Sequence, residues 1–191
     1  MTALLAASAV ANAEPPSLET IVSRLALSED AITLDYREIR KSSLLTDAVV
    51  TPGRIRIHGD GRIRQRWRGD DGIYRLRVDD DRVRLSTPQR ERQITLSRRP
   101  RLEGLITALR ALTQGDTARL RHQFDVTISG ESDNWQLSLG FGQARQAGRG
   151  GVGQPTPPAS RIQIDGGEGI KRIRLQGGQQ DRLIIIEDGP R

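Results

Sequence analysis

The feature that most constrains the fold is a regular alternation of apolar and charged residues that runs, with short polar interruptions, from residue 49 to residue 96. Aliphatic residues occupy every second position of each segment, and arginine occupies most of the positions between them. A two-residue period places the apolar side chains on one face of a β-strand and the charged ones on the other. The alternation therefore predicts antiparallel strands with one face against a core and one basic face in water.

Short polar turns divide this alternation into strands. Gly59-Asp60-Gly61 joins a hairpin of residues 54–58 and 62–67, and residues 69–72 turn the chain into the next strand. The other strands are expected at 32–39, 73–78, 83–85, 93–96, 124–128, 135–139, 162–164, 170–175 and 183–186, with a turn at Ser129-Gly130. Strands so close together in sequence indicate an antiparallel meander.

Two segments have the period of an amphipathic helix instead. Ser17 is placed to cap a helix that ends near Leu27, with an apolar stripe of Leu18, Ile21, Val22 and Leu25. After Pro100, a second helix that Gly115 ends has an apolar face of Leu102, Leu105, Ile106, Leu109 and Leu112. The sequence therefore predicts a mainly β fold with a few helices.

The chain of 191 residues is the size of a single domain with its own core. Residues 1–13 are small and apolar and end in Ala11-Asn12-Ala13, which is typical of a signal peptide with its cleavage site, although a basic start is missing. The alternative is an apolar N-terminal helix. We expect export, one domain over residues 14–191, and a flexible loop at 140–160, where glycine and proline are frequent.

Composition excludes several chemistries. The chain has no cysteine, so it has no thiol nucleophile, disulfide or cysteine-based zinc site. Aromatic residues make up only 3%, which predicts an aliphatic core. The net charge of +6 favours anionic partners. Only Lys41 and Lys171 of the 30 basic residues are lysine, which we interpret as a general compositional bias towards arginine.

No motif in the sequence predicts catalysis. Gly148–Gly153 matches the glycine pattern of dinucleotide sites, but a proline-rich segment follows it where such a site needs a helix. His58 and His122 have no serine or carboxylate in a recognisable motif beside them. The run Asp79–Asp81 has no distal ligand set and predicts a charged turn. We therefore expect no enzyme, no catalytic residues, no cofactor and no metal.

The order of features resembles the LolA-like family of periplasmic lipoprotein carriers, in particular its divergent members associated with aryl-polyene or pigment-type lipid biosynthesis. The segments that carry the resemblance are Tyr36–Arg40 with Leu44-Leu45 and Pro52-Gly53, the helix of residues 102–112 with Gly115-Asp116 and Leu120, Gly130 with Trp135–Leu139, and Ile162–Leu175 with Gln180–Leu183. The resemblance implies an incomplete antiparallel β-barrel, or half-barrel, with a helical lid over a cavity that holds an acyl chain.

On this basis we expect a periplasmic carrier or chaperone that binds an acyl or other apolar lipid-like moiety and ferries it towards the outer membrane. The residues predicted to line the cavity are Ile55, Ile57, Ile63, Trp67, Leu76, Val78, Trp135, Leu137 and Leu139. For Trp67 and Trp135, packing in a filled core is the alternative.

The expected partners are a lipidated protein or lipid-like cargo, donor and acceptor membrane proteins, and a transient membrane contact for exposed arginines such as Arg54 and Arg56. The protein is expected to be a monomer that binds no nucleic acid. Two alternatives stay open: a basic nucleic-acid-binding module, whose binding weakens steeply with salt, and a cargo-free structural protein of the envelope.

Overall fold

The computed structural model describes residues 15–27, 31–42, 47–141, 161–176 and 180–187. The predicted signal peptide lies outside these residues, as does the predicted loop except for its first two positions, Gly140 and Phe141.

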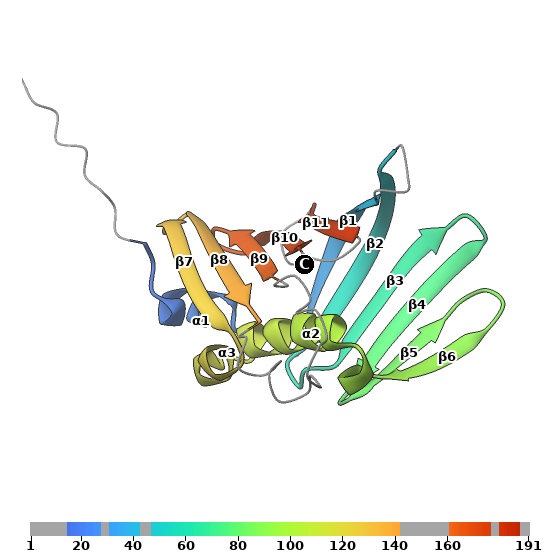
Figure 1. Cartoon of the computed structure of the whole chain (residues 1–191), viewed down its shortest axis with the longest axis horizontal. Helices are drawn as coiled ribbons and strands as arrows, with labels where there is room; N and C mark the ends of the chain where they lie inside the picture. The colour runs from blue at the N-terminus through green and yellow to red at the C-terminus, as the bar shows by residue number, and fades with distance from the viewer. Residues whose placement is uncertain (1–14, 28–30, 43–46, 142–160, 177–179, 188–191) are drawn as a thin grey trace, which may run out of the picture.

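The described residues form one antiparallel sheet of 11 strands in the order β6-β5-β4-β3-β2-β1-β11-β10-β9-β8-β7. Their bounds are β1 (Ala31–Ser42), β2 (Val49–His58), β3 (Ile63–Gly69), β4 (Gly72–Asp79), β5 (Arg82–Ser86), β6 (Glu91–Thr95), β7 (Asp125–Glu131), β8 (Asn134–Gly140), β9 (Arg161–Gly166), β10 (Ile170–Gln176) and β11 (Gln180–Ile186). The sheet does not close on itself, and Figure 1 shows it curving around a long helix. The predicted fold class, a mainly β half-barrel with a helical lid, is confirmed.

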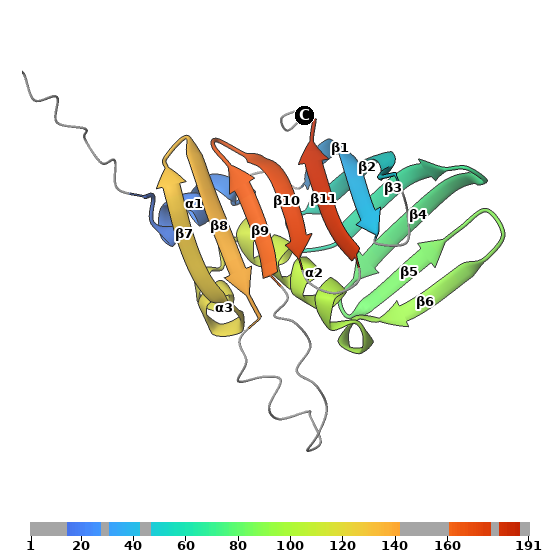
Figure 2. The ribbon, with the colours of Figure 1, turned by 45° about the horizontal axis from the view of Figure 1, so that its top comes forward.

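The first and last strands of the described residues pair in the middle of the sheet. β1 pairs with β2 on one side and with β11 on the other, with Tyr36 opposite both Gly53 and Ile186. The two edges of the sheet, β6 and β7, follow each other in sequence and are joined by the helical segment of the chain (Figure 2).

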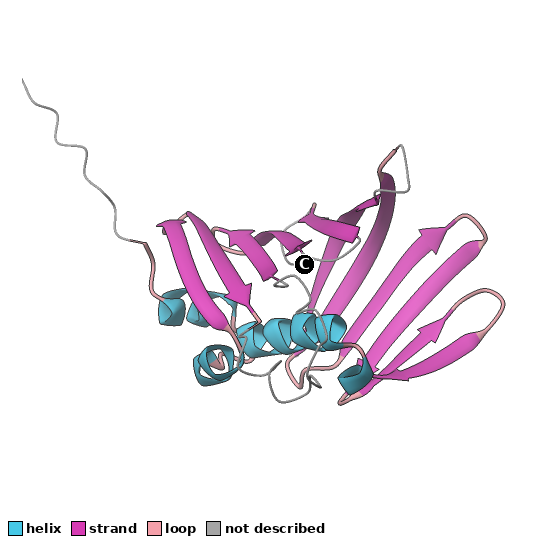
Figure 3. Cartoon of the chain, in the orientation of Figure 1, coloured by secondary structure: helices cyan, strands magenta, loops and turns pink. Residues whose placement is uncertain are grey.

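The helices are α1 (Leu18–Leu25), the 3₁₀ turn η1 (Leu96–Arg98), α2 (Pro100–Thr113) and α3 (Thr117–Gln123). As predicted, Ser17 caps α1: its hydroxyl accepts a hydrogen bond from the Thr20 amide at 3.1 Å. α2 begins at Pro100, and Gly115 adopts a φ of +75° beyond its end. All helices in Figure 3 lie on one side of the sheet, and α2 crosses its concave face.

Two details differ from the sequence prediction. α3 was not expected, because in its seven residues only Leu120 is buried; Asp116 caps it by accepting a hydrogen bond from the Arg119 amide at 2.8 Å. The predicted turn at Ser129-Gly130 was wrong, since Gly130 belongs to β7 and the turn is formed by residues 132–133. Gly130 has a φ of +89°, and a side chain there would overlap the Asn134 carbonyl oxygen, so this position of β7 requires glycine.

Candidate functional site

The concave face of β2, β3, β4 and β5 is built from rows of side chains that lie directly opposite one another. The row nearest α2 consists of Ile57, Ile63, Val78 and Val83, all at most 2% exposed. The next row, two residues further along each strand, consists of the half-buried Ile55, Gln65, Leu76 and Leu85. Burial therefore decreases from the first row to the second, and the concave face of these strands becomes a floor that is partly open to solvent.

A cavity of about 70 Å³ lies between this floor and α2. Its walls are aliphatic except for Tyr36 and Gln65, and they come from the sheet and the helix together. The lining residues are Leu34, Tyr36, Ile55, Ile57, Ile63, Gln65, Leu76, Leu102, Leu105, Ile106, Leu109, Ile170, Ile173, Ile184 and Ile186. Since one water molecule takes about 30 Å³ of liquid volume, a space of this size is a narrow gap under the helix.

An aromatic row continues the floor beyond the cavity. Gly53 lies opposite Trp67, and Trp67 lies opposite Tyr74, whose ring stacks on the indole with centroids 5.4 Å apart. The missing side chain of Gly53 makes room for the Tyr36 ring, which a Cβ at this position would overlap. The Tyr36 hydroxyl accepts a hydrogen bond from Gln65, and burial raises its pKa to about 12, so the phenol is neutral.

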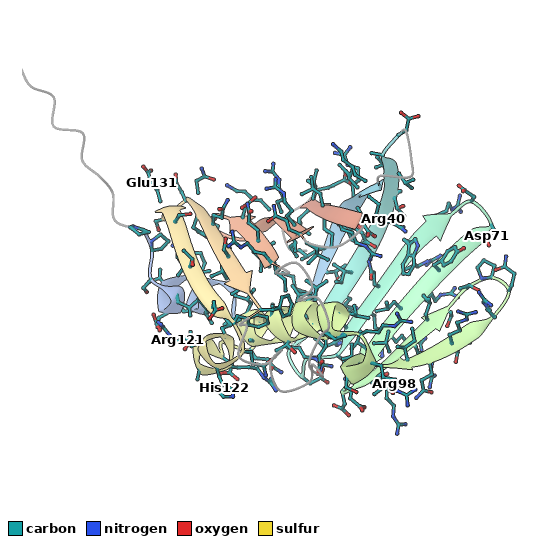
Figure 4. The ribbon with its side chains drawn as sticks, viewed as in Figure 1. Arg40, Asp71, Arg98, Arg121, His122 and Glu131 are labelled. Carbon is teal, nitrogen blue, oxygen red and sulfur yellow. The ribbon has the colours of Figure 1, made fainter. Side chains whose placement is uncertain are left out.

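A charged group ends the same face at the far end of β1. Glu38 and Arg40 share the concave parity of Tyr36, and Arg182 of β11 lies directly opposite Arg40. Glu38 Oε1 lies 3.5 Å from Arg40 Nε and 3.6 Å from Arg182 Nη1, and the Glu38 side chain is only 12% exposed. Arg40 Nε is buried without a hydrogen bond in the described structure. Figure 4 marks Arg40 on β1, between β2 and β11.

Sequence reasoning missed this group. The sequence does contain a signal for part of the group. Tyr36, Glu38 and Arg40 are each two residues apart, and side chains at this spacing point to the same face of a strand. The role of Arg182 depends on the pairing of β1 with β11, which are far apart in sequence.

The two halves of α2 are held differently. In the C-terminal half, Ala108, Leu109, Ala111 and Leu112 are buried. Arg110 also donates hydrogen bonds to the Gly61 and Asp80 carbonyl oxygens in the strand turns, each at 2.7 Å. In the N-terminal half, Ile106 is buried, but Leu102 and Leu105 over the cavity are only partly buried, and the N-cap residue Arg99 makes no side-chain capping bond. The first turns of α2 are therefore less firmly attached than its C-terminal half, although residues of both halves line the cavity.

The predicted cavity residues fall into three places. Ile55, Ile57, Ile63 and Leu76 line the cavity, while Val78 lies in the fully buried row beside it. Trp67 is half-buried in the aromatic row. Trp135, Leu137 and Leu139 of β8 belong to the filled core, at most 1% exposed, and the Trp135 indole donates a hydrogen bond to the Gly167 carbonyl oxygen at 2.7 Å. Contact of these residues with a cargo stays a prediction.

The described residues contain no group of three or more His, Cys, Asp or Glu side chains arranged to hold a metal ion. None of the helices in these ranges is both long enough and apolar enough to span a bilayer.

An open antiparallel sheet with an apolar concave face under one covering helix defines the class of half-barrel proteins with a helical lid. The family model described as "Outer membrane lipoprotein carrier protein LolA-like" matches residues 9–151, which is most of the chain. The chain therefore belongs to the LolA-like family. A search of curated proteins found no significant match.

Three solved structures have a similar arrangement. The LolA superfamily protein NE2245 from Nitrosomonas europaea is 9% identical with a TM-score of 0.47, covering 90% of each chain. The Mycobacterium tuberculosis lipoprotein LppX is 8% identical with a TM-score of 0.41, covering 88% of this chain and 93% of that one. LprF from Mycobacterium bovis is 12% identical with a TM-score of 0.39, covering 92% and 94%. At these values the family assignment rests on the sequence match.

Proposed function

We propose that the protein is a carrier that holds an acyl chain or a similar apolar moiety on its concave face, under α2. The observation that supports this most is the opening floor of the half-barrel: an apolar surface continues from the cavity to solvent without being filled by side chains of the described chain. The family to which the chain belongs is described by lipoprotein carriage, which agrees with this use of the surface.

The dimensions of the floor suit one acyl chain. From the row of Ile55 to the row of Thr51, where Glu38 begins the charged group, the strand advances four residues, which is about 13 Å at about 3.3 Å per residue. One leaflet of a bilayer, half of its hydrocarbon core, measures roughly 15 Å. Each methylene that leaves water contributes about 0.8 kcal/mol, so eight of them contribute about 6 kcal/mol before the costs of binding.

The cavity of about 70 Å³ is too small for such a chain, so loading requires α2 to move. The partly buried N-terminal half, with Leu102 and Leu105, is the part that moves, and the C-terminal half stays bound through Arg110. A donor protein that displaces the first turns of α2 would expose the floor, and an acceptor would do the same during release.

The charged group at the end of the floor orients the cargo. An acyl chain in the cavity and along Trp67 leaves its polar end near Glu38, Arg40 and Arg182. Two guanidinium groups with one carboxylate give this end a net positive charge, which favours an anionic or carbonyl-rich head. With the predicted signal peptide, this gives a periplasmic carrier that ferries a lipidated protein or lipid towards the outer membrane.

The test is native mass spectrometry with lipid extraction on the protein purified from the periplasm of its own host. Leu76→Trp places an indole in the cavity, and Ile73→Trp introduces the same side chain on the convex face of the same strand, outside the cavity lining. We expect an apolar species with the wild type and with Ile73→Trp, and its loss with Leu76→Trp.

Circular dichroism and thermal unfolding establish that both variants are folded. An apo mass for the wild type would favour the cargo-free structural alternative. Equal cargo in both variants would place the binding site outside the cavity.

A further inference from the structure

The convex face of the sheet carries arginines directly opposite one another. The pairing of β2, β3, β4 and β5 puts one row of guanidinium groups across four strands and a second row beside it. The first row is Arg56, Arg64, Arg77 and Arg84, and the second is Arg54, Arg66 and Arg75. All seven are exposed, and we call them the convex arginine surface.

Few of the arginines on this surface are neutralised by a neighbouring carboxylate. Arg54 pairs with Asp35 at 2.6 Å and Arg84 with Glu91 at 3.4 Å, while the other five form no ion pair with a described carboxylate. The seven arginines and the two carboxylates that pair with them therefore have a net charge of +5.

The arrangement is unfavourable for the fold itself. Like charges directly opposite each other on one face of a sheet are destabilising, and five such arginine pairs occur here: Arg54 with Arg66, Arg66 with Arg75, Arg56 with Arg64, Arg64 with Arg77, and Arg77 with Arg84. A compositional preference for arginine over lysine explains the residue type but not this placement. An anionic partner that covers the surface would explain it.

The positive charge also affects His58. Burial and then the charges of Arg56, Arg62 and Arg64 lower the pKa of His58, which lies at the end of β2. The field therefore extends to the end of the strand.

We propose that the convex arginine surface docks the protein on an anionic phospholipid membrane, with the loaded concave face turned away from the headgroups. Strands about 4.8 Å apart and a two-residue repeat of about 6.8 Å make a grid of cations roughly 14 Å by 7 Å. Such a grid fits a plane of phosphates. This adds a membrane contact to the proposed carrier function and does not depend on cargo, because the two faces of the sheet are separate.

A single-stranded nucleic acid is the less suitable partner for this surface. Single strands bind through aromatic side chains on which bases stack, in addition to phosphate contacts. Trp67 and Tyr74 belong to the concave face, and none of the other aromatic residues of the chain lies on the convex strands β2 to β5. The convex arginine surface therefore offers contacts to phosphates alone.

The test is co-sedimentation of the full mature protein with vesicles of phosphatidylcholine alone or mixed equally with phosphatidylglycerol. One variant combines Arg56→Gln, Arg64→Gln and Arg77→Gln. The control combines Arg92→Gln, Arg98→Gln and Arg119→Gln, which changes the net charge equally but lies outside the convex arginine surface. Each arginine at an anionic surface strengthens binding roughly fivefold, so the first variant should bind about 100-fold more weakly.

We expect the wild type to bind the anionic vesicles and to lose this binding at about 1 M salt, where the Debye length is about 3 Å. The control variant should retain the binding. Absence of binding, or an equal loss in both variants, overturns it. Tighter binding to a duplex oligonucleotide than to the vesicles would assign the surface to nucleic acid instead. Mass spectrometry of cargo in the convex variant separates the two proposals, since cargo is expected to remain when membrane binding is lost.

Discussion

The convex arginine surface leads to a stability prediction that needs no ligand. Arg64 is directly opposite Arg56 on one side and Arg77 on the other. Directly opposite pairs change stability by about 0.2–1 kcal/mol, and like charges do so unfavourably. Replacing Arg64 by glutamine removes two unfavourable pairs, so we expect the free energy of unfolding to increase by about 0.5–2 kcal/mol.

Urea unfolding measures this change. With a slope of about 2 kcal/mol per M, the midpoint should rise by about 0.2–1 M at low salt. The Debye length falls from about 30 Å at 0.01 M salt to about 3 Å at 1 M, so the gain should nearly vanish at the higher concentration. This salt dependence separates charge repulsion from an effect of glutamine itself.

Arg54→Gln is the matched control, because Arg54 lies on the same face but donates two hydrogen bonds to Asp35, at 2.6 and 2.9 Å. Its replacement removes a favourable pair along with the repulsion from Arg66, and we expect no comparable gain. A loss of stability in Arg64→Gln, or a gain that is the same at both salt concentrations, would refute the reasoning.

Three further predictions concern other parts of the molecule. The pKa of His58 is lowered in the folded protein, so the unfolded chain, in which the imidazole titrates near 6.5, takes up the proton first as the pH falls. The contribution of His58 to the free energy of unfolding should therefore be fully present above pH 6.5 and be lost progressively below it. Urea unfolding between pH 7 and 5.5 should show this slope, and His58→Gln should flatten it. Glu38→Gln leaves Arg40 and Arg182 without their shared carboxylate and should lower the free energy of unfolding by about 1–3 kcal/mol, whereas no change in urea unfolding would mean that the group is fully solvated. Amide hydrogen exchange should be faster at residues 103–107 of α2 than at residues 108–113, and uniform protection along the helix would contradict opening from its N-terminal half.

The meander could be predicted because each strand of β2 to β5 has one apolar and one charged face. A one-residue shift would bring Arg64 or Arg77 into the core, so the pattern determines both the strand and its parity. α2 could be predicted for the same reason, since its apolar stripe has the helical period. α3 could not, because one buried leucine in seven residues has no period.

The candidate site was predicted in part. The parity of Ile55, Ile63 and Leu76 places them on the concave face, and the cavity lies over them. Trp135 and Leu137 are equally apolar but lie in the filled core. The sequence could not show this difference, because it does not show where α2 ends over the floor. Glu38, Arg40 and Arg182 were missed because their group requires the contact between the first and last strands of the chain.

The connection between the two sheet edges has a mechanical consequence. The chain leaves edge strand β6, passes through η1, α2 and α3, and enters the opposite edge strand β7. The helical segment therefore links the two ends of the arc that the curved sheet forms. α2 is about 21 Å long at 1.5 Å per residue and stiff. The lid therefore cannot lift as a free flap: its N-terminal half moves only if the β5–β6 side of the arc moves with it or if the first turns of α2 unwind. Unless the first turns of α2 unwind, the curvature of the sheet and the opening of the lid change together, and a break in the backbone between β6 and α2 would separate them while leaving every strand pair intact.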